Sequence, residues 1–98
     1  LLFTAHLGTA SSLLDLGRRL GVDAARLAEV LSGGSGASFA LSRVAAAGAT
    51  LDLIAGHAGP LLQKDVRLVA DLADAAGVSG GAVLDAADAA LEAMGHRR

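Results

Sequence analysis

Residues 60–76 read PLLQKDVRLVADLADAA and carry the clearest helical pattern in the chain. Apolar side chains recur every three or four residues and predict one inward stripe on a helix, formed by Leu62, Val66, Val69, Ala73 and Ala76. A second stripe is charged and predicted to face outward: Lys64, Arg67, Asp71 and Asp74. Pro60 suits the first turn, where its missing N–H has no bond to lose, and Gly77 suits the residue that follows a helix. The segment therefore predicts a helix over Pro60–Ala76.

The same spacing of apolar residues, every three or four positions, occurs at both ends of the chain. A helix over Leu1–Leu20 is predicted, ending at Gly21. Its inward stripe is Phe3, Leu7, Ala10 and Leu14, widened by Leu13, Leu16 and Leu20. A last helix is predicted over Ala82–Met94, with Ser79 as its cap. The inward residues of that helix are Leu84, Ala87, Leu91 and Met94.

Shorter helices are predicted between these two. Asp23 is a good N-cap for a helix over Ala24–Leu31, with Leu27, Ala28 and Leu31 inward. A third helix is predicted over Ala37–Ala47, with Phe39, Leu41 and Val44 inward. Residues Thr50–Ala55 predict a further short helical turn, ending before the sequence Gly-His-Ala-Gly at 56–59.

The composition agrees with a helical fold. Hydrophobic residues make up 53 % of the chain, mostly Ala, Leu and Val, whereas aromatic residues make up only 2 %. Alanine and leucine lead the helix propensities, and no segment shows the alternation of a strand. The 98 residues suit one domain. We therefore predict an all-α fold, a five- to six-helix bundle.

Charge and cysteine content exclude several classes of protein. The net charge is −2, and the only basic clusters are Arg18–Arg19 and Arg97–Arg98, so we expect no nucleic acid partner. No apolar run reaches the roughly 20 residues of a membrane span, so we expect no membrane partner. The absence of cysteine excludes disulfides and is typical of a cytoplasmic protein.

Few residues are candidates for chemistry. The glycine-rich stretch Ser32–Gly36 follows a predicted helix rather than a strand, which favours a helix-to-helix turn over a phosphate loop. His6, His57 and His96 have no metal-binding spacing, and we predict no metal site. Ser11 and Ser12 have no nearby base.

Charged residues on the predicted helices have ordinary explanations, with one exception. The acidic residues Asp85, Asp88 and Glu92 are predicted to form a solvated helix face, and Arg67 and Asp71 a surface ion pair. Lys64 lies near the start of its predicted helix, where the helix dipole disfavours a cation. The pattern leaves open whether Lys64 is a surface lysine or a contact to an anion or ligand.

Three motifs resemble one enzyme family. The run Lys64–Asp71 resembles the Lys-Asp-Leu-x-x-Ala-x-Asp segment of the β-hydroxyacid dehydrogenases, which include 3-hydroxyisobutyrate dehydrogenase and 6-phosphogluconate dehydrogenase-like proteins. Residues Leu31–Leu41 resemble the family's Leu-Ser-Gly-Gly-Ser-Gly-x-Ser-Trp-x-Leu turn, and Arg19–Asp23 fits the pattern that precedes it. Order and spacing match over roughly Leu1 to Gly95.

The resemblance implies the helical C-terminal domain of such an enzyme. It implies that residues 1–98 are a single domain of a longer protein, without the N-terminal dinucleotide-binding domain that would be their partner. It implies NAD or NADP as cofactor of the whole protein, Lys64 as a cofactor-binding residue, and a homodimer. The family's catalytic lysine and asparagine would precede Leu1, so this chain alone is expected to contain no catalytic residue and to be inactive.

Two positions depart from the family pattern. His57 stands where the family often has Phe, at the substrate cleft, and Val69 stands where it often has Ala.

The predicted substrate is a small β-hydroxyacid or its semialdehyde. The alternatives are a helical interaction module with no enzyme parent, or a parent of the same fold that resembles the imine reductases. An upstream Gly-x-x-x-Lys-x-x-x-Asn segment would distinguish the dehydrogenase from the module.

Overall fold

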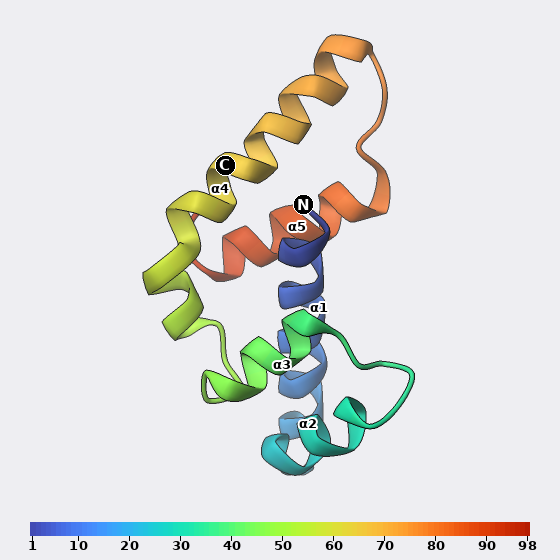
Figure 1. Cartoon of the computed structure of the whole chain (residues 1–98), viewed down its shortest axis with the longest axis vertical. Helices are drawn as coiled ribbons and strands as arrows, with labels where there is room; N and C mark the ends of the chain where they lie inside the picture. Colours follow the sequence, from blue (N-terminus) through green and yellow to red (C-terminus); the bar gives the residue numbers. More distant parts are fainter.

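The computed structural model describes residues 1–98 and contains five helices and no strand, which confirms the all-α prediction. The helices are α1 (Leu2–Arg19), α2 (Ala24–Ser32), α3 (Phe39–Ala46), α4 (Asp52–Ala76) and α5 (Gly81–Ala93). Helix α1 runs through the middle of the molecule (Figure 1), with α5 across its N-terminal half and α2 and α3 beside its C-terminal half. A helix bundle therefore forms around α1.

The core is built from small and medium-sized side chains. Leu7 and Leu14 of α1 are fully buried, as the stripe on that helix predicted. All four inward residues predicted for the last helix, from Leu84 to Met94, are also buried. Helices α1 and α5 approach closely at Gly8, because a Cβ there would lie 2.5 Å from the Cβ of Ala90. The alanine-rich composition thus allows close helix packing in place of large rings.

The cap predicted at Asp23 is observed, whereas the N-cap of α5 is Gly80 rather than the predicted Ser79. The carboxylate of Asp23 accepts a hydrogen bond from the backbone N–H of Arg26 at 3.0 Å, and so begins α2. The hydroxyl of Ser79 accepts one from the backbone N–H of Gly81 at 3.1 Å, just before α5. These contacts place the helix starts within a residue or so of the predicted ones.

The prediction that a helix begins at Pro60 is wrong. Helix α4 begins at Asp52 and continues without interruption through residues 56–59 and Pro60 to Ala76. The short turn predicted over Thr50–Ala55 is therefore largely the first part of α4 rather than a separate element. Proline inside a helix removes one backbone hydrogen bond and usually kinks or ends the helix.

Two features keep α4 helical at this proline. Gly59 precedes it and has no Cβ, which removes part of the steric clash that normally excludes the residue before proline from helical geometry. In addition, Ile54, Ala55 and Ala58 are partly buried against the core, so packing stabilises the turns before Pro60. Local sequence rules describe only the first of these effects.

Five further residues named in the predictions differ from them. Phe39 is 72 % exposed rather than inward, and α3 buries Ala40, Leu41 and Val44 instead. Leu13, Leu16 and Leu20 are exposed and so do not widen the buried stripe of α1. Val69 is only partly buried, because α4 turns Gly59, Leu62, Val66 and Ala70 inward.

The last residues pack between α4 and α5. The ring of His96 lies against Gly59, where a Cβ would overlap it. The side-chain amide of Gln63 donates a hydrogen bond to the carbonyl oxygen of Arg97 at 2.6 Å. Arg98 donates two hydrogen bonds to the carboxylate of Asp88, at 2.6 and 2.9 Å. The C-terminal tail therefore fixes α4 against α5.

The acidic face predicted for α5 is not simply solvated. Arg98 and Asp88 form an ion pair, and Arg97 lies 3.6 Å from Glu92, whereas Asp85 is exposed and unpaired. The hydrogen bonding of the Arg98 guanidinium to the carboxylate of Asp88 raises the pKa of Arg98. The two arginines at the C-terminus thus pair with two of the three acidic residues of this face.

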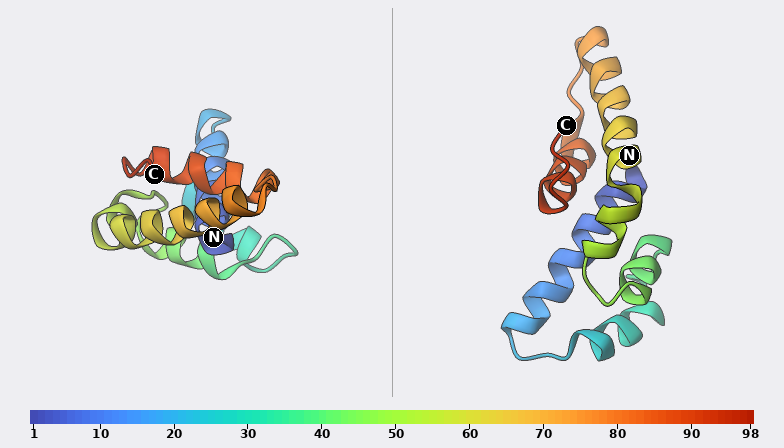
Figure 2. Two further views of the ribbon diagram at one scale, coloured as in Figure 1. Left: turned by 90° about the horizontal axis from the view of Figure 1, so that it is seen from above. Right: turned by 90° about the vertical axis from the view of Figure 1, so that its left-hand side faces the viewer.

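One end of α4 gives the molecule its length. The helix has 25 residues and so spans about 37 Å at 1.5 Å per residue. Its C-terminal end and the turn after it extend beyond the other helices (Figure 2), and the overall dimensions are 43 × 27 × 22 Å. No helix combines the length and apolar character that crossing a membrane requires.

Candidate functional site

Lys64 lies in the middle of α4 with its side chain 62 % exposed. Its ammonium nitrogen Nζ is 3.3 Å from Oδ1 of the adjacent Asp65. The ion pair predicted between Arg67 and Asp71 does not form, and Asp65 is the only carboxylate that pairs with a cation on this helix. Because the pair with Asp65 is exposed, it leaves Lys64 able to bind another anion.

Lys64 shares its face of α4 with apolar residues. Leu61 and Leu68 are its neighbours at spacings of three and four residues, and each is 56 % exposed. Leu72, one turn further, is also exposed. His57 lies two helical turns before Lys64 on the same face, about 10 Å away along the axis. A lysine among exposed leucines is typical of a surface that another domain or partner covers.

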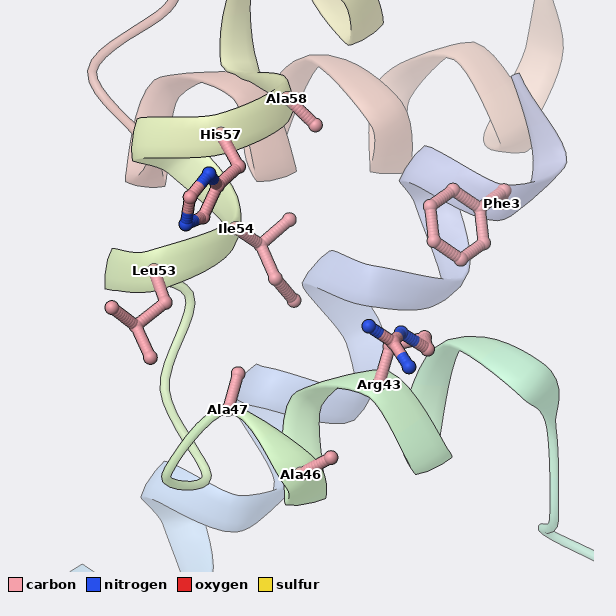
Figure 3. A pocket seen from close by; sticks show the side chains of 8 residues that line it. All are labelled: Phe3, Arg43, Ala46, Ala47, Leu53, Ile54, His57 and Ala58. Atoms are coloured by element: carbon pink, nitrogen blue, oxygen red, sulfur yellow. The ribbon is translucent and has the colours of Figure 1, made fainter.

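A cavity of about 380 Å³ adjoins this face at its N-terminal end. Leu53, Ile54 and His57 line it from α4, Phe3 from α1, and Arg43 from α3 (Figure 3). The remaining lining residues are Ala46, Ala47 and Ala58. The Arg43 side chain points from α3 into the space between Phe3 and Ile54 (Figure 3). An apolar cavity with one convergent cation has the general character of a small-molecule site.

Sequence reasoning missed Arg43. It is the only charged residue between Glu29 and Asp52, and that isolation in an uncharged stretch is the one signal that marks it. No carboxylate lies within ion-pair distance of Arg43, in contrast to Lys64. The cavity could not be derived from the sequence, because it is assembled from three helices.

The glycine-rich stretch Ser32–Gly36 connects α2 to α3 without a strand before it. The nearby Ser38 hydroxyl accepts a hydrogen bond from the backbone N–H of Leu41 at 2.9 Å and so caps α3. Ser35 and Gly36 border a shallow cavity with His6 of α1. The arrangement is that of a helix-to-helix turn, as predicted.

The three histidines lie on different parts of the fold. His6 is on α1, His57 on α4 and His96 in the C-terminal tail. Nowhere do three His, Asp or Glu side chains gather in a way that could hold a metal ion. His57 is the one that borders the cavity of Phe3 and Arg43.

The residues described here can be compared with those that a dinucleotide cofactor needs for binding. The ammonium group of Lys64 has three donors and is open to solvent, which fits a contact to a phosphate or carboxylate group. The five helices include no strand–turn–helix unit of the kind that holds a pyrophosphate. The residues present therefore fit a single contact to such a cofactor rather than its main binding site.

The comparisons with known proteins give one match. The model of the family described as "NAD-binding of NADP-dependent 3-hydroxyisobutyrate dehydrogenase" matches residues 1–97, almost the whole chain. No curated protein and no solved structure matches the chain. The family match covers α1 to α5 together with the tail, and so includes both Lys64 and the cavity beside it.

Proposed function

Because this chain belongs to the family of the NAD-binding domain of NADP-dependent 3-hydroxyisobutyrate dehydrogenase, we propose that it works as the helical domain of an NAD(P)-dependent oxidoreductase. The proposed substrate is a small β-hydroxyacid or its semialdehyde. A dehydrogenase family favours this function over an interaction module with no enzyme parent. The proposal includes an upstream dinucleotide-binding domain, which would supply the catalytic lysine and asparagine.

The observation that carries the proposal is the exposed face of α4. On that face a lysine stands between two half-exposed leucines, Leu61 and Leu68. A second domain packed over the leucines would enclose Lys64 in a cleft and remove water around its charge. Coulombic attraction is stronger in such a cleft than in open solvent. The face thus supports a role for Lys64 at a domain boundary.

Lys64 would act by holding an anionic group. Its Nζ, 3.3 Å from Oδ1 of Asp65, would donate hydrogen bonds to a cofactor phosphate or a substrate carboxylate. When bound, the nicotinamide cofactor supplies the hydride chemistry. The part of this chain is to position an anion and to exclude water from the cleft.

The test is steady-state kinetics of Lys64→Ala in the enzyme that carries this domain beside its dinucleotide-binding domain. A charge-assisted hydrogen bond contributes roughly 1.5–3 kcal/mol, so kcat/KM should fall about ten- to a hundred-fold. The melting temperature should not change, because the side chain is exposed. Arg67→Ala is the matched control, since it removes an exposed, unpaired cation one turn away. A stable Lys64→Ala enzyme with full activity would contradict the assignment.

A homodimer is the second part of the proposal, and α1 supports it. Among the exposed residues of this helix and its C-cap, one mostly apolar line can be drawn, formed by Leu2, Thr9, Leu13, Leu16 and Leu20. Their spacings of seven, four, three and four residues are those of a helix that pairs with another helix. We therefore propose that the α1 helices of two copies pack together along this line.

The 98-residue chain by itself should neither bind a dinucleotide tightly nor catalyse a reaction. Lys64 would supply only one contact to such a cofactor, and one contact is too weak to hold it. Titration of the chain with NADPH, followed by the cofactor's fluorescence, is the direct measurement. Reduction of NADP⁺ by the purified chain with a small hydroxyacid would overturn the division of roles between the two domains.

A further inference from the structure

The cavity between α1, α3 and α4 has an apolar floor and a charged rim. The floor consists of Phe3, Ala47, Ile54 and Ala58, which are partly buried. The ring of Phe3 is held by a contact with Phe39, at 5.8 Å between centroids and 40° between planes. Arg43 and His57 are exposed at the rim. The cavity can therefore take an apolar group inside and a polar group at its mouth.

Arg43 provides the charge that such a ligand would meet. Its guanidinium is directed toward the cavity (Figure 3), and no carboxylate of the chain neutralises it. The cations Arg19, Lys64, Arg97 and Arg98 have an acidic partner, whereas Arg43, like Arg18, Arg26 and Arg67, has none. A planar guanidinium matches a carboxylate with two parallel hydrogen bonds. An unpaired arginine above an apolar floor thus favours an amphipathic anion over a hydrated ion.

We propose that this cavity binds an organic monocarboxylate with an aromatic or branched apolar tail. The tail lies on the floor between Phe3 and Ile54, and the carboxylate lies on Arg43. At about 30 Å³ for each water-sized group, 380 Å³ holds roughly a dozen such groups, enough for an arylacetate. Lys64 does not line the cavity, but His57 does and stands where the family resemblance places the substrate cleft, so a substrate as the ligand rests on the proposed function, whereas phenylacetate binding to the chain does not.

The test is a titration of the ¹⁵N-labelled chain with phenylacetate, followed by NMR chemical shifts. Shifts should concentrate at Phe3, Arg43, Ile54 and His57. Arg43→Gln should weaken binding about tenfold or more, which is the usual effect of losing a charge-assisted hydrogen bond. Arg26→Gln is the matched control, because Arg26 is exposed, unpaired and lines no cavity. It should leave the affinity unchanged.

A second comparison changes the ligand instead of the protein. Phenylacetamide has the shape of phenylacetate without its charge and should bind about tenfold more weakly. Equal binding of the amide, equal binding by Arg43→Gln, or the absence of shifts at the cavity would each overturn the proposal.

A last experiment, on the whole enzyme, identifies which molecule carries the carboxylate that binds at Arg43. A raised KM for the hydroxyacid in Arg43→Gln assigns the carboxylate to the substrate. An unchanged KM together with lost phenylacetate binding assigns it to a separate ligand.

Discussion

Gly8 of α1 and Ala90 of α5 are in such close contact that the two backbones leave no room for a side chain at position 8. A Cβ at Gly8 would lie 2.5 Å from the Cβ and 3.0 Å from the Cα of Ala90. Since the Cα belongs to the backbone, no rotamer change can relieve the overlap. The contact between the two helices that make the largest interface of the fold therefore depends on this glycine.

Gly8→Ala should consequently destabilise the domain. Overpacking between helices costs typically about 1–3 kcal/mol, more than the roughly 1 kcal/mol that alanine gains over glycine in a helix. The control is Gly56→Ala in α4, where no atom lies within 4 Å of the added Cβ. That variant should be stabilised by about 0.5–1 kcal/mol. Urea denaturation measures both, and equal shifts in the two variants would contradict the close approach.

Pro60→Ala should stabilise the chain. The substitution restores a backbone donor for the carbonyl of Gly56 within a continuous helix, which we expect to contribute about 1 kcal/mol or more. Hydrogen exchange gives a second measurement, since the new amide at position 60 should be protected. If a separate helix began at Pro60 instead, that amide would exchange freely and the stability would not rise.

Asp88→Asn should loosen the C-terminal tail. Asp88 accepts two hydrogen bonds from Arg98, and both side chains are about one-third exposed, so the loss should be about 1 kcal/mol or less. The matched control is Asp85→Asn on the same helix, which has no ion pair and should change little. The thermal midpoints of both variants, compared at low and high salt, test this. A difference that persists undiminished at high salt would argue against an electrostatic origin.

Leu16→Glu should prevent the proposed dimer. The substitution places a charge in the middle of the exposed line on α1, where a second helix would have to desolvate it. Leu72→Glu makes the same change at a leucine of α4 that is more exposed than Leu16, and should leave the dimer intact. Light scattering at high micromolar concentration is the measurement. A monomeric parent chain, or equal effects of the two substitutions, would refute the pairing through α1.

The sequence predicted the helices better than their faces. The period of residues 1–20 correctly indicated that Leu7 and Leu14 are buried, because one stripe of a long helix must meet the core. The same rule failed for Phe39, whose ring lies on Phe3 at the surface rather than inside. A ring that packs on a distant helix leaves no periodic signal in its own segment.

Local rules also misplaced the start of α4. A proline after a Gly-His-Ala-Gly sequence normally indicates a new helix, and only the packing of Ile54 and Ala58 against the core overrides that indication. The candidate site likewise has one part that the local sequence indicates and one part that only the tertiary packing produces. The exposure of Lys64 could be read from its helix, whereas the approach of Arg43 to Phe3 and His57 joins segments that are 40 and 14 residues apart in the sequence.

The projecting end of α4 has a hydrodynamic consequence. A particle of 43 × 27 × 22 Å is about twice as long as it is thin, so it meets more friction than a sphere of the same mass. The 98-residue chain should therefore elute early from a size-exclusion column and sediment slowly, and a monomer would pass for a larger species by elution volume alone. Rotational diffusion should be anisotropic as well: amides whose N–H vectors lie along α4 should relax at a different rate from those of α5, which crosses the molecule in another direction.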